Sequence, residues 1–513
     1  MKHVRGATVF GIALIVVGVG SFVLTLVVDA AAKAEVIAGN FPVNEGAMDP
    51  GDITAHNSPT VARNPARLEN LVVVNRIDRP DFSCSLHTSF DGGSTFEEGE
   101  IPLPDEKVKC FAPDATFDAA GTLYVSFVTL EGLANVPAAG WITRSDDGGV
   151  TFSDPVRVLD ELSFQVRLIA DPQEPERLYL TWLQAEDVAI LAFPGTSYPI
   201  LSARSDDGGA TWTDPVPVAD DSRARVVAPS PAVGRAGEIY VAYLDLGEDK
   251  LDYNGGHQGT GGPPYPGTWQ LVLARSDDGG DSWSETVVAD AVTPTERFIV
   301  FLPAFPSVAV EPEGGRVHVA FHDGSLGDSD VYVWTSEDRG RTFGDAVRVN
   351  DTREGDRSTQ RLPKIAVAED GRVDIIYLDR RADLDDVLTD VSFQYSYDGG
   401  LSFRPRIRLN DEAFSALVGV GSEVGLPDQG SRIGLISTGN RALGVWTDTR
   451  AGTEASSKQD VVRAVVEFSD EAALPDPVVL GFRYGGVALA VVGLIVLASS
   501  PRPSAGEEGG EAA

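Results

Sequence analysis

Six short stretches rich in aspartate and glycine are the first candidates for chemistry in this sequence. Three begin with RSDDGG, at Arg144, Arg204 and Arg275, and three looser copies begin at Ser89, Ser336 and Ser396. Oxygen-rich loops can hold Ca²⁺, but calcium loops space their ligands alternately and end in an acidic residue, whereas these octets end in Phe or Trp. They therefore predict turns in which the Asp carboxylate accepts hydrogen bonds from backbone N–H and Ser or Thr hydroxyl groups, while a glycine takes a positive φ.

A second set of residues combines arginine with aspartate where apolar runs end. Examples are RIDR (76–79), LDRR (378–381) and TDTR (447–450), and FHD (321–323) ends in Asp without an arginine. A guanidinium group binds a carboxylate through two parallel hydrogen bonds, so this set could hold an anionic ligand. The simpler alternative is that each Arg pairs with an Asp that opens the next strand and closes a hairpin; Asp330, Asp390 and Asp460 occupy such positions.

Further arginines come just before apolar runs, and two long insertions fall in the same parts of the repeat. The insertion at 246–270 is rich in Gly, Tyr and Trp, as a sugar-binding lid would be, and the other spans 410–431. The candidate ligand-binding residues are Arg76, Asp78, Arg79, Arg297, Asp323, Arg361, Asp379, Arg380, Arg432, Asp448 and Arg450.

The elements that must position these residues are short strands. An apolar stretch, a Gly-bearing turn and a β-branched or aromatic run recur seven times, as in SVAVEPEGGRVHVAFHD (307–323) and KIAVAEDGRVDIIYLDR (364–380). A third strand then enters an octet and a fourth leaves it. Four strands repeated at intervals of roughly 55–75 residues predict an all-β propeller of four-stranded blades. Six octets but seven of the longer phrases favour seven blades, with six as the alternative.

The N-terminal stretch FPVNE (41–45) has no blade of its own. It resembles VRVND (347–351) and IRLND (407–411), which end fourth strands, while the seventh unit stops after its third strand, QDVVRAVVEF (459–468). We therefore expect an N-terminal strand to complete the last blade. Closure of this kind removes an exposed sheet edge.

The octet pattern Ser-x-Asp-x-Gly-x-Thr/Ser-Phe/Trp resembles the Asp box of the sialidase-type (BNR-repeat) propellers, and the resemblance covers about residues 35–470. The structural aspartates of these boxes would be Asp91, Asp147, Asp207, Asp278, Asp338 and Asp398. The resemblance implies a ligand site on the face away from the boxes. There, sialidases bind a carboxylate with three arginines and use a Tyr nucleophile paired with Glu, plus an Asp acid/base.

The match to an active sialidase is incomplete in this sequence. The family's Phe/Tyr-Arg-Ile-Pro motif is missing, with NRIDRP (75–80) and QRLP (360–363) as distant echoes. No Tyr/Glu pair can be assigned, although Tyr253, Tyr265, Glu248 and Glu423 lie in long loops. We therefore expect a propeller that binds glycans or other surface ligands. An active exo-sialidase and a non-catalytic protein-interaction scaffold are the alternatives, and whether the chain is an enzyme stays open.

Composition limits the partners. With 41 Lys and Arg against 77 Asp and Glu, the net charge of −36 would repel nucleic acid. No cofactor or metal site is expected, because the six histidines form no cluster and Cys84 and Cys110 are 26 residues apart, a spacing that fits no common zinc pattern. If the domain is extracellular, these cysteines would form a disulfide, with two buried thiols as the alternative.

Two apolar runs bracket the repeats; the first carries no charge, and the second contains Arg483 near its outer end. Residues 6–28 are long enough to cross a bilayer, and Lys2 and Arg5 before them favour a cytoplasmic N-terminus. A retained anchor and a cleaved signal segment both fit. A second run at 478–500 predicts a C-terminal transmembrane helix, followed by a short disordered tail at 501–513. The propeller at 35–470 would then lie on the extracellular side of the cell membrane.

Overall fold

Runs rich in Val, Ile, Leu and Tyr, separated by turn residues, fold into seven sheets in the computed structural model of the chain. The structure describes residues 34–468 except 106–107, 134, 187–197, 224, 250–264, 296–302, 314 and 426. Outside this range it describes only 13–17, 19, 487, 489–492 and 494–496. Each sheet is one blade of a propeller. The predicted all-β fold with seven blades is confirmed, and the alternative of six is wrong.

The first four blades follow one another along the chain, with antiparallel pairing throughout. Blade one contains β2 (His56–Arg63), β3 (Leu71–Ile77), β4 (Ser83–Ser89) and β5 (Glu97–Gly99). Blade two contains β6 (Lys109–Phe117), β7 (Leu123–Glu131), β8 (Val136–Ser145) and β9 (Val156–Leu159). Blade three contains β10 (Ser163–Ala170), β11 (Leu178–Gln184), β12 (Ile200–Ser205) and β13 (Val216–Pro217). Blade four contains β14 (Val226–Val233), β15 (Ile239–Asp245), β16 (Trp269–Ser276) and β17 (Ser284–Val292).

The last three blades complete the ring. Blade five contains β18 (Ser307–Val310), β19 (Val317–Asp323), β20 (Asp330–Ser336) and β21 (Val347–Arg348). Blade six contains β22 (Gln360–Val367), β23 (Val373–Asp379), β24 (Leu388–Ser396) and β25 (Ile407–Arg408), with β26 (Phe414–Ser415) also paired to β24. Blade seven contains β27 (Gly434–Thr438), β28 (Arg441–Asp448), β29 (Asp460–Phe468) and β1 (Ala34–Pro42), and a 3-10 helix, η2 (Ser422–Val424), lies in the link before it.

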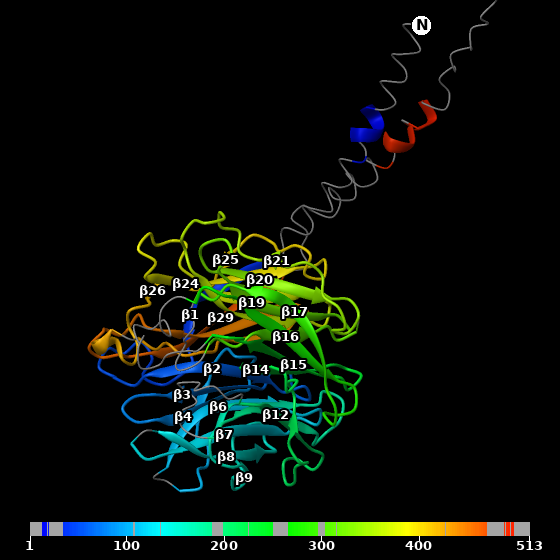
Figure 1. The fold of residues 1–513 in the computed structure, drawn as a ribbon. Helices are drawn as coiled ribbons and strands as arrows, with labels where there is room; N and C mark the ends of the chain where they lie inside the picture. The colour runs from blue at the N-terminus through cyan, green and yellow to red at the C-terminus, as the bar shows by residue number, and fades with distance from the viewer. Residues whose placement is uncertain are drawn as a thin grey trace, which may run out of the picture. The chain divides into compact units, whose positions relative to one another are not determined.

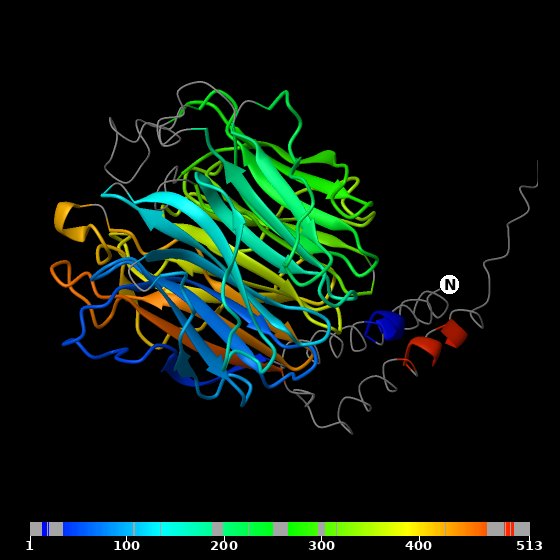
Figure 2. The same cartoon turned by 90° about the horizontal axis from the view of Figure 1, so that it is seen from below.

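The N-terminal strand completes blade seven, as predicted. The blue strand β1 lies beside β29 among the last strands of the chain (Figure 1), and Figure 2 shows the first and last strands together from a second direction. Asn44 follows β1 and accepts a hydrogen bond from Val461 N at 2.7 Å. Asn410 makes the equivalent contact with Val391 N at 2.7 Å, and Asn350 with Val331 N at 2.8 Å. The resemblance of FPVNE to VRVND and IRLND therefore reflects one shared hydrogen-bond pattern.

The hydrophobic core lies between blades. All seven residues of β19 and of β23 are buried, because the second strand of a blade is covered on both faces by neighbouring blades. One core cluster joins Val72, Val74 and Leu86 of blade one to Leu123 and Phe127 of blade two. A disulfide between Cys84 on β4 and Cys110 on β6, with Cα atoms 5.4 Å apart, links the same two blades.

The two faces of the ring carry different connections. The octets join third to fourth strands and share one face with the turns between first and second strands; we call this the octet face. Asn70, in such a turn, donates a hydrogen bond to Gly148 O of the next blade's octet at 3.1 Å. The links from second to third strands and from blade to blade lie on the opposite face, the loop face. Asn57 and Gln459 meet there at 2.9 Å.

Each octet is a hydrogen-bonded turn. In the octet of blade one, Ser89 Oγ donates to Asp91 Oδ1 at 2.8 Å, and Thr95 N and Oγ1 donate to the two carboxylate oxygens at 2.9 and 2.7 Å. Gly93 has a φ of 83°. Asp338 has the same partners, and the hydrogen bonds from Thr342 and Ser336 lower its pKa to about 2. These contacts are those of a structural turn.

The segments outside the propeller are described only in small part. The chain separates into a unit at Val36–Val465, which is the propeller, and a unit that combines Met1–Glu35 with Val466–Ala513. Within the described residues, no helix has the length and apolar character needed to span a membrane. The runs predicted to be membrane segments, 6–28 and 478–500, lie mostly outside the described residues, as does the tail 501–513.

Candidate functional site

The first strands of all seven blades enclose a central cavity of about 280 Å³. Neighbouring first strands contact one another around the ring, and β27 contacts β2. The cavity is lined by residues of β2, β6, β10, β14, β18, β22 and β27, together with residues that precede β18 and β27. Every blade therefore contributes to one site.

A β-bulge aims side chains into the cavity from five of these strands. The register of β2, β6, β10, β14 and β22 against the second strand shifts by one position near the start of each strand. The bulged residues have positive φ values of 51–61°; they are Ser58, Ala112, Gln165, Ala228 and Leu362. In four of the five strands a proline follows, which fits a bulge because proline has no N–H to donate to the ladder. The residue that lines the cavity comes directly after this proline, or after Val166 in the strand without one.

Seven register-equivalent positions form a ring around the cavity. In the first six blades each pairs with the fourth residue of the second strand, and in blade seven, where β28 begins one residue earlier, with the fifth. These partners are Val74, Ser126, Thr181, Ala242, Ala320, Ile376 and Val445. The seven ring residues are Thr60, Asp114, Arg167, Ser230, Ser307, Lys364 and Gly434, and all of them line the cavity. The ring thus holds two cations, one carboxylate, three hydroxyl groups and one glycine.

The glycine of the ring has no room for a side chain. A Cβ atom on Gly434 would lie 2.7 Å from Val61 Cγ1. In this blade Arg432, two residues earlier, lines the cavity in its place. Arg432 is only 8% exposed, and its Nη1 atom is buried with no hydrogen-bond partner among the residues that the structure describes.

Arg167, Lys364 and Arg432, which we call the cavity cations, share one carboxylate. Arg167 Nε donates to Asp114 Oδ2 at 2.8 Å, and Leu168 N donates to the same oxygen at 3.2 Å. Arg432 Nη1 lies 4.0 Å from Asp114 Oδ1. A fourth cation of the lining, Arg63, is paired with Glu369 at 2.6 Å. The cavity therefore has an excess of positive charge inside a strongly acidic protein.

The pKa values reflect this excess. Burial and repulsion by Arg167 lower the pKa of Lys364 to about 8, although Asp114 acts in the opposite direction. The same two causes hold the pKa of Arg432 below its usual value, but the guanidinium stays charged at neutral pH. Burial would raise the pKa of Asp114, but the charges of Arg167 and Arg432 and its hydrogen bonds keep it low. An anion in the cavity would relieve the repulsion between these cations.

The arginines predicted at the first blade are paired on the loop face. Arg76 Nη2 lies 2.8 Å from Asp78 Oδ2 and 2.7 Å from Asp428 Oδ2, and its side chain is almost fully buried. Burial raises the pKa of Asp78 to about 6. Arg79 is more exposed and lies 3.9 Å from Glu423. Arg76 and Asp78 thus form a buried ion pair and are not directed at a ligand.

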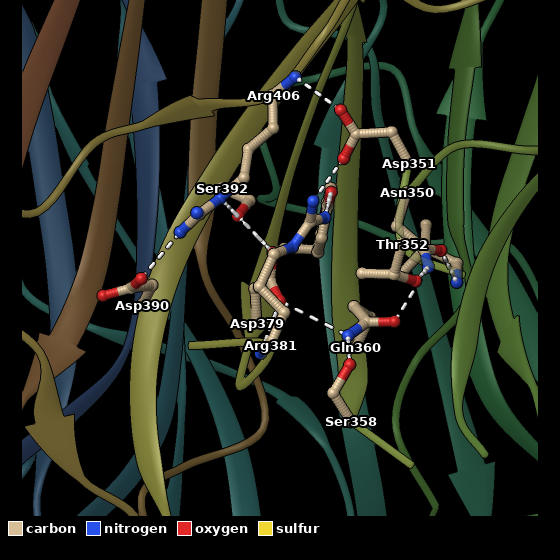
Figure 3. A network of polar contacts seen from close by, with 12 residues as sticks. Asn350, Asp351, Thr352, Ser358, Gln360, Asp379, Arg381, Asp390, Ser392 and Arg406 are labelled. Atoms are coloured by element: carbon tan, nitrogen blue, oxygen red, sulfur yellow. Dashed lines mark hydrogen bonds and ion pairs between the residues drawn. The ribbon is translucent and has the colours of Figure 1, made fainter. Parts of the chain in front are cut away.

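Asp379, one of the predicted residues of blade six, belongs to a polar network (Figure 3). Arg381 Nε donates to Asp379 Oδ2 at 2.7 Å, and Ser392 Oγ donates to the same atom at 2.6 Å. Arg380 donates to Asp386 Oδ2 at 3.4 Å. Arg406, which sequence reasoning missed, pairs with Asp390 at 2.7 Å. The arginines after β23 are therefore paired within the protein, but with Asp379 and Asp386. Asp390, the partner that the hairpin-closing alternative expected, pairs with Arg406 instead.

The remaining candidates divide between the loop face and the cavity. Asp448 pairs with Arg450 at 2.9 Å, and Arg450 also pairs with Asp411. Asp323 accepts a hydrogen bond from Thr293 N at 2.9 Å. Arg361 lies on β22 before the bulge, and Arg297 lies outside the described residues. Of the predicted ligand-binding residues, Arg432 alone is among the described residues that line the central cavity.

Sequence reasoning missed Asp114, Arg167 and Lys364, although a signal for them exists. The triplets SPT (58–60), APD (112–114), APS (228–230), FPS (305–307) and LPK (362–364) all end on a ring residue. Aligning these five units on the proline marks the position that lines the cavity. QVR (165–167) has valine instead of proline, and the pairing of Arg167 with Thr181 assigns Arg167 to the same position.

A tyrosine–glutamate pair occurs away from the cavity. Tyr243 on β15 donates to Glu285 on β17, and Arg223 pairs with Glu285 at 2.7 Å and with Asp245 at 2.9 Å. β17 is the strand of blade four farthest from the cavity. Among the described residues that line the cavity there is no tyrosine, glutamate or histidine.

Searches with the sequence found no matching family model and no matching curated protein. Solved structures with a similar fold were found. A protein of unknown function from Dyadobacter fermentans is 14% identical, with 86% of this chain and 99% of that chain covered and a TM-score of 0.45. A Hadza microbial sialidase is 16% identical (83% and 68% covered, TM-score 0.42), and an α-L-arabinofuranosidase of Fusarium graminearum is 15% identical (72% and 96% covered, TM-score 0.42).

Proposed function

We propose that this protein binds an acidic saccharide in the central cavity, with the anionic group of the sugar on Arg432 and Lys364. The observation that carries the proposal is that three cations line the cavity with a single described carboxylate, Asp114, which faces Arg167 and Arg432. Arg432 Nη1 is buried and without a hydrogen-bond partner among the described residues. Burying uncompensated charge is costly. A site that keeps such an excess is expected to gain its counter-charge from a ligand.

The rest of the lining suits a sugar. Thr60, Ser230 and Ser307 place three hydroxyl groups on the ring, and Phe305 offers an aromatic face beside Arg167, whose Cζ atom lies 5.4 Å from the ring centroid. Ligand pockets commonly measure ~300–1,000 Å³, so a cavity of about 280 Å³ fits one sugar residue better than a chain of them.

Binding is favoured over hydrolysis. Glycoside hydrolysis needs two carboxyl groups, or a nucleophile with its own base, on either side of the scissile bond. The cavity has one carboxylate among its described lining residues, and it is engaged by Arg167 and Leu168. The pair of Tyr243 and Glu285 is too far out in blade four to serve this cavity.

Calorimetry with the full-length protein tests the proposal. We expect D-glucuronate to bind and D-glucose not to bind. Lys364→Met and Arg432→Met should each weaken glucuronate binding by at least about 10-fold, because each removes a charged hydrogen-bond donor. Arg235→Met, on the octet face, is the control and should change nothing. Equal binding by all four proteins would refute the proposal, and turnover of a fluorogenic sialoside would show an enzyme instead.

We also propose that the chain is anchored in the cell membrane with the propeller outside. The apolar runs 6–28 and 478–500 support this, together with Lys2 and Arg5. β1 ends beside Asp460 on the loop face, so β1 begins and β29 ends on the octet face.

Epitope labelling in intact cells tests this arrangement. An epitope inserted after Gly132, in a link on the loop face, should be labelled without permeabilisation, and an epitope at the C-terminus should not. Alkaline carbonate should leave the protein in the membrane pellet. Release into the supernatant, or labelling of the C-terminal epitope in intact cells, would refute the anchored arrangement.

A further inference from the structure

Asp114 is the one carboxylate among the described cavity-lining residues, and it is held in its ionised form. Its side chain is almost fully buried, with Arg167 Nε and Leu168 N on Oδ2 and Ala115 N on Oδ1 at 3.2 Å. Oδ1 also faces Arg432 Nη1 at 4.0 Å. Asp114 therefore provides an internal counter-ion for the cavity cations when no ligand is bound.

The same carboxylate restricts what can bind. An ionised Asp offers only acceptor oxygens, so any ligand atom next to it must donate a hydrogen bond or meet a repulsive contact. A ligand anion on Arg432 would lie close to Asp114 Oδ1, because these two groups are 4.0 Å apart. Like charges placed together without a proton between them are an effective means of rejecting a ligand.

We propose that Asp114 is a specificity-determining residue that admits anions carrying a neighbouring hydroxyl group and rejects anions that have only acceptor oxygens. This inference rests on the proposed binding of an acidic saccharide in the cavity. The hydroxyl group donates to Asp114 Oδ1 while the anionic group accepts from Arg432 and Lys364. Hydroxylated carboxylic acids, including acidic sugars, fit this requirement, whereas sulfate and plain carboxylates do not.

The proposed preference for hydroxylated anions has the same physical basis as the selectivity of other sites with a buried hydrogen-bond acceptor. A site that is arranged to hydrogen-bond a ligand hydroxyl group discriminates strongly against the analogue that lacks it, since the buried acceptor is then left unpaired. Here the acceptor is charged, and the rejected ligand is charged as well. The unpaired acceptor and the repulsion between like charges therefore both weaken the binding of an anion that has no hydroxyl group.

The test uses three anions and the full-length protein. We expect wild type to bind D-glucuronate at least about 10-fold more tightly than cyclohexanecarboxylate, which keeps the ring and carboxylate but has no hydroxyl groups, or than sulfate. Asp114→Asn should lose most of this preference, mainly by binding sulfate more tightly. Asp171→Asn is the matched control, because Asp171 is equally buried in a turn between first and second strands and accepts backbone N–H bonds from Gln173 and Glu174.

The outcomes separate the two proposals. If Asp114→Asn keeps the wild-type preference, or if wild type binds the three anions equally, the role of Asp114 is refuted while binding in the cavity stands. The wild-type comparison holds even if Asp114→Asn fails to fold. If wild type binds none of the three anions, the proposed function is refuted, and the role of Asp114 with it.

Discussion

Lys364 is the residue whose ionisation links ligand binding to pH. Three charged groups face it, Arg167 on β10, Asp114 on β6 and Arg432 before β27, and burial with repulsion by Arg167 lowers its pKa to about 8. A bound anion would stabilise the protonated amine and raise that pKa again. Binding and proton uptake by Lys364 are therefore coupled in this account.

We predict that glucuronate binding takes up protons and weakens as the pH rises above about 8. Below that value Lys364 is already charged in the free protein, so the affinity should be nearly constant. Calorimetry in buffers of different ionisation enthalpy measures the proton uptake. Affinity that stays constant from pH 7 to 10 would contradict the role of Lys364.

The same residue should lower the stability of the unliganded protein. The pKa of Lys364 lies below its usual value of 10.5, so its charged form destabilises the fold, and this cost is fully present below about pH 8. As the pH rises from about 8 towards 10.5, the folded state gives up the proton first and the cost declines. We predict that Lys364→Met raises the midpoint of thermal unfolding at pH 7 by a few degrees, with the gain shrinking at pH 9–10. A lower midpoint at pH 7 would contradict this.

At the scale of elements, β1 is as much a part of its blade as any fourth strand. Asn44, Asn350 and Asn410 each follow a fourth strand, accept the N–H of a third-strand residue and donate to the Asp that precedes it. The N-terminal segment is held further by Lys458, whose buried amine lies 3.1 Å from both Asp52 and Asp460. Closure of the ring therefore relies on one repeated contact and one additional ion cluster.

We predict that Asn44→Ala lowers the free energy of unfolding by about 1–3 kcal/mol, because it leaves the buried N–H of Val461 without its acceptor and removes one hydrogen bond to Asp460. Asn410→Ala, the matched variant in blade six, should cost a similar amount. Urea denaturation of both variants provides the comparison. A negligible cost for Asn44→Ala beside a normal cost for Asn410→Ala would mean that β1 does not close the ring in solution.

The blades could be predicted from the sequence, but the residues that line the cavity could be predicted only in part. Octets and alternating strand phrases repeat over tens of residues, so the blades and the closing strand were predictable. The hydrophobic pattern that predicts the strands does not mark the bulges near Ser58, Ala112 and Leu362; the proline that follows each of these residues is the signal for them. Attention to residues flanking strands found Arg432 but not Asp114 and Lys364, which lie within strands and reach the cavity through the bulge.

At the scale of the whole molecule, neutral histidines buried in two blades should make the fold sensitive to acid. Burial lowers the pKa of His56 and His318 to about 4 and that of His87 to about 3, against a usual value of 6.5. The unfolded chain takes up protons at these residues before the folded protein does. Stability is therefore present above about pH 6.5 and falls as the pH decreases towards 4.

We predict that the urea midpoint of wild type decreases steadily from pH 6.5 to pH 4, and that His318→Gln reduces the slope of this decrease. His318 accepts or donates one hydrogen bond with Thr335 Oγ1 at 2.9 Å, which a glutamine can replace in part. His257→Gln, in the Gly-rich insertion at 246–270 of the sequence, serves as the control. An unchanged slope in His318→Gln would show that other groups govern the acid response.

The ring as a whole directs one residue from every blade at a single cavity, and a structure with ligand tests this claim most directly. We predict that crystals of the protein grown with D-glucuronate show the sugar inside the ring, with its carboxylate within hydrogen-bond distance of Arg432 Nη1 and Lys364 Nζ and a hydroxyl group on Asp114 Oδ1. A sugar bound instead among the loop-face arginines, such as Arg79 or Arg450, or an empty cavity at saturating ligand, would contradict the account.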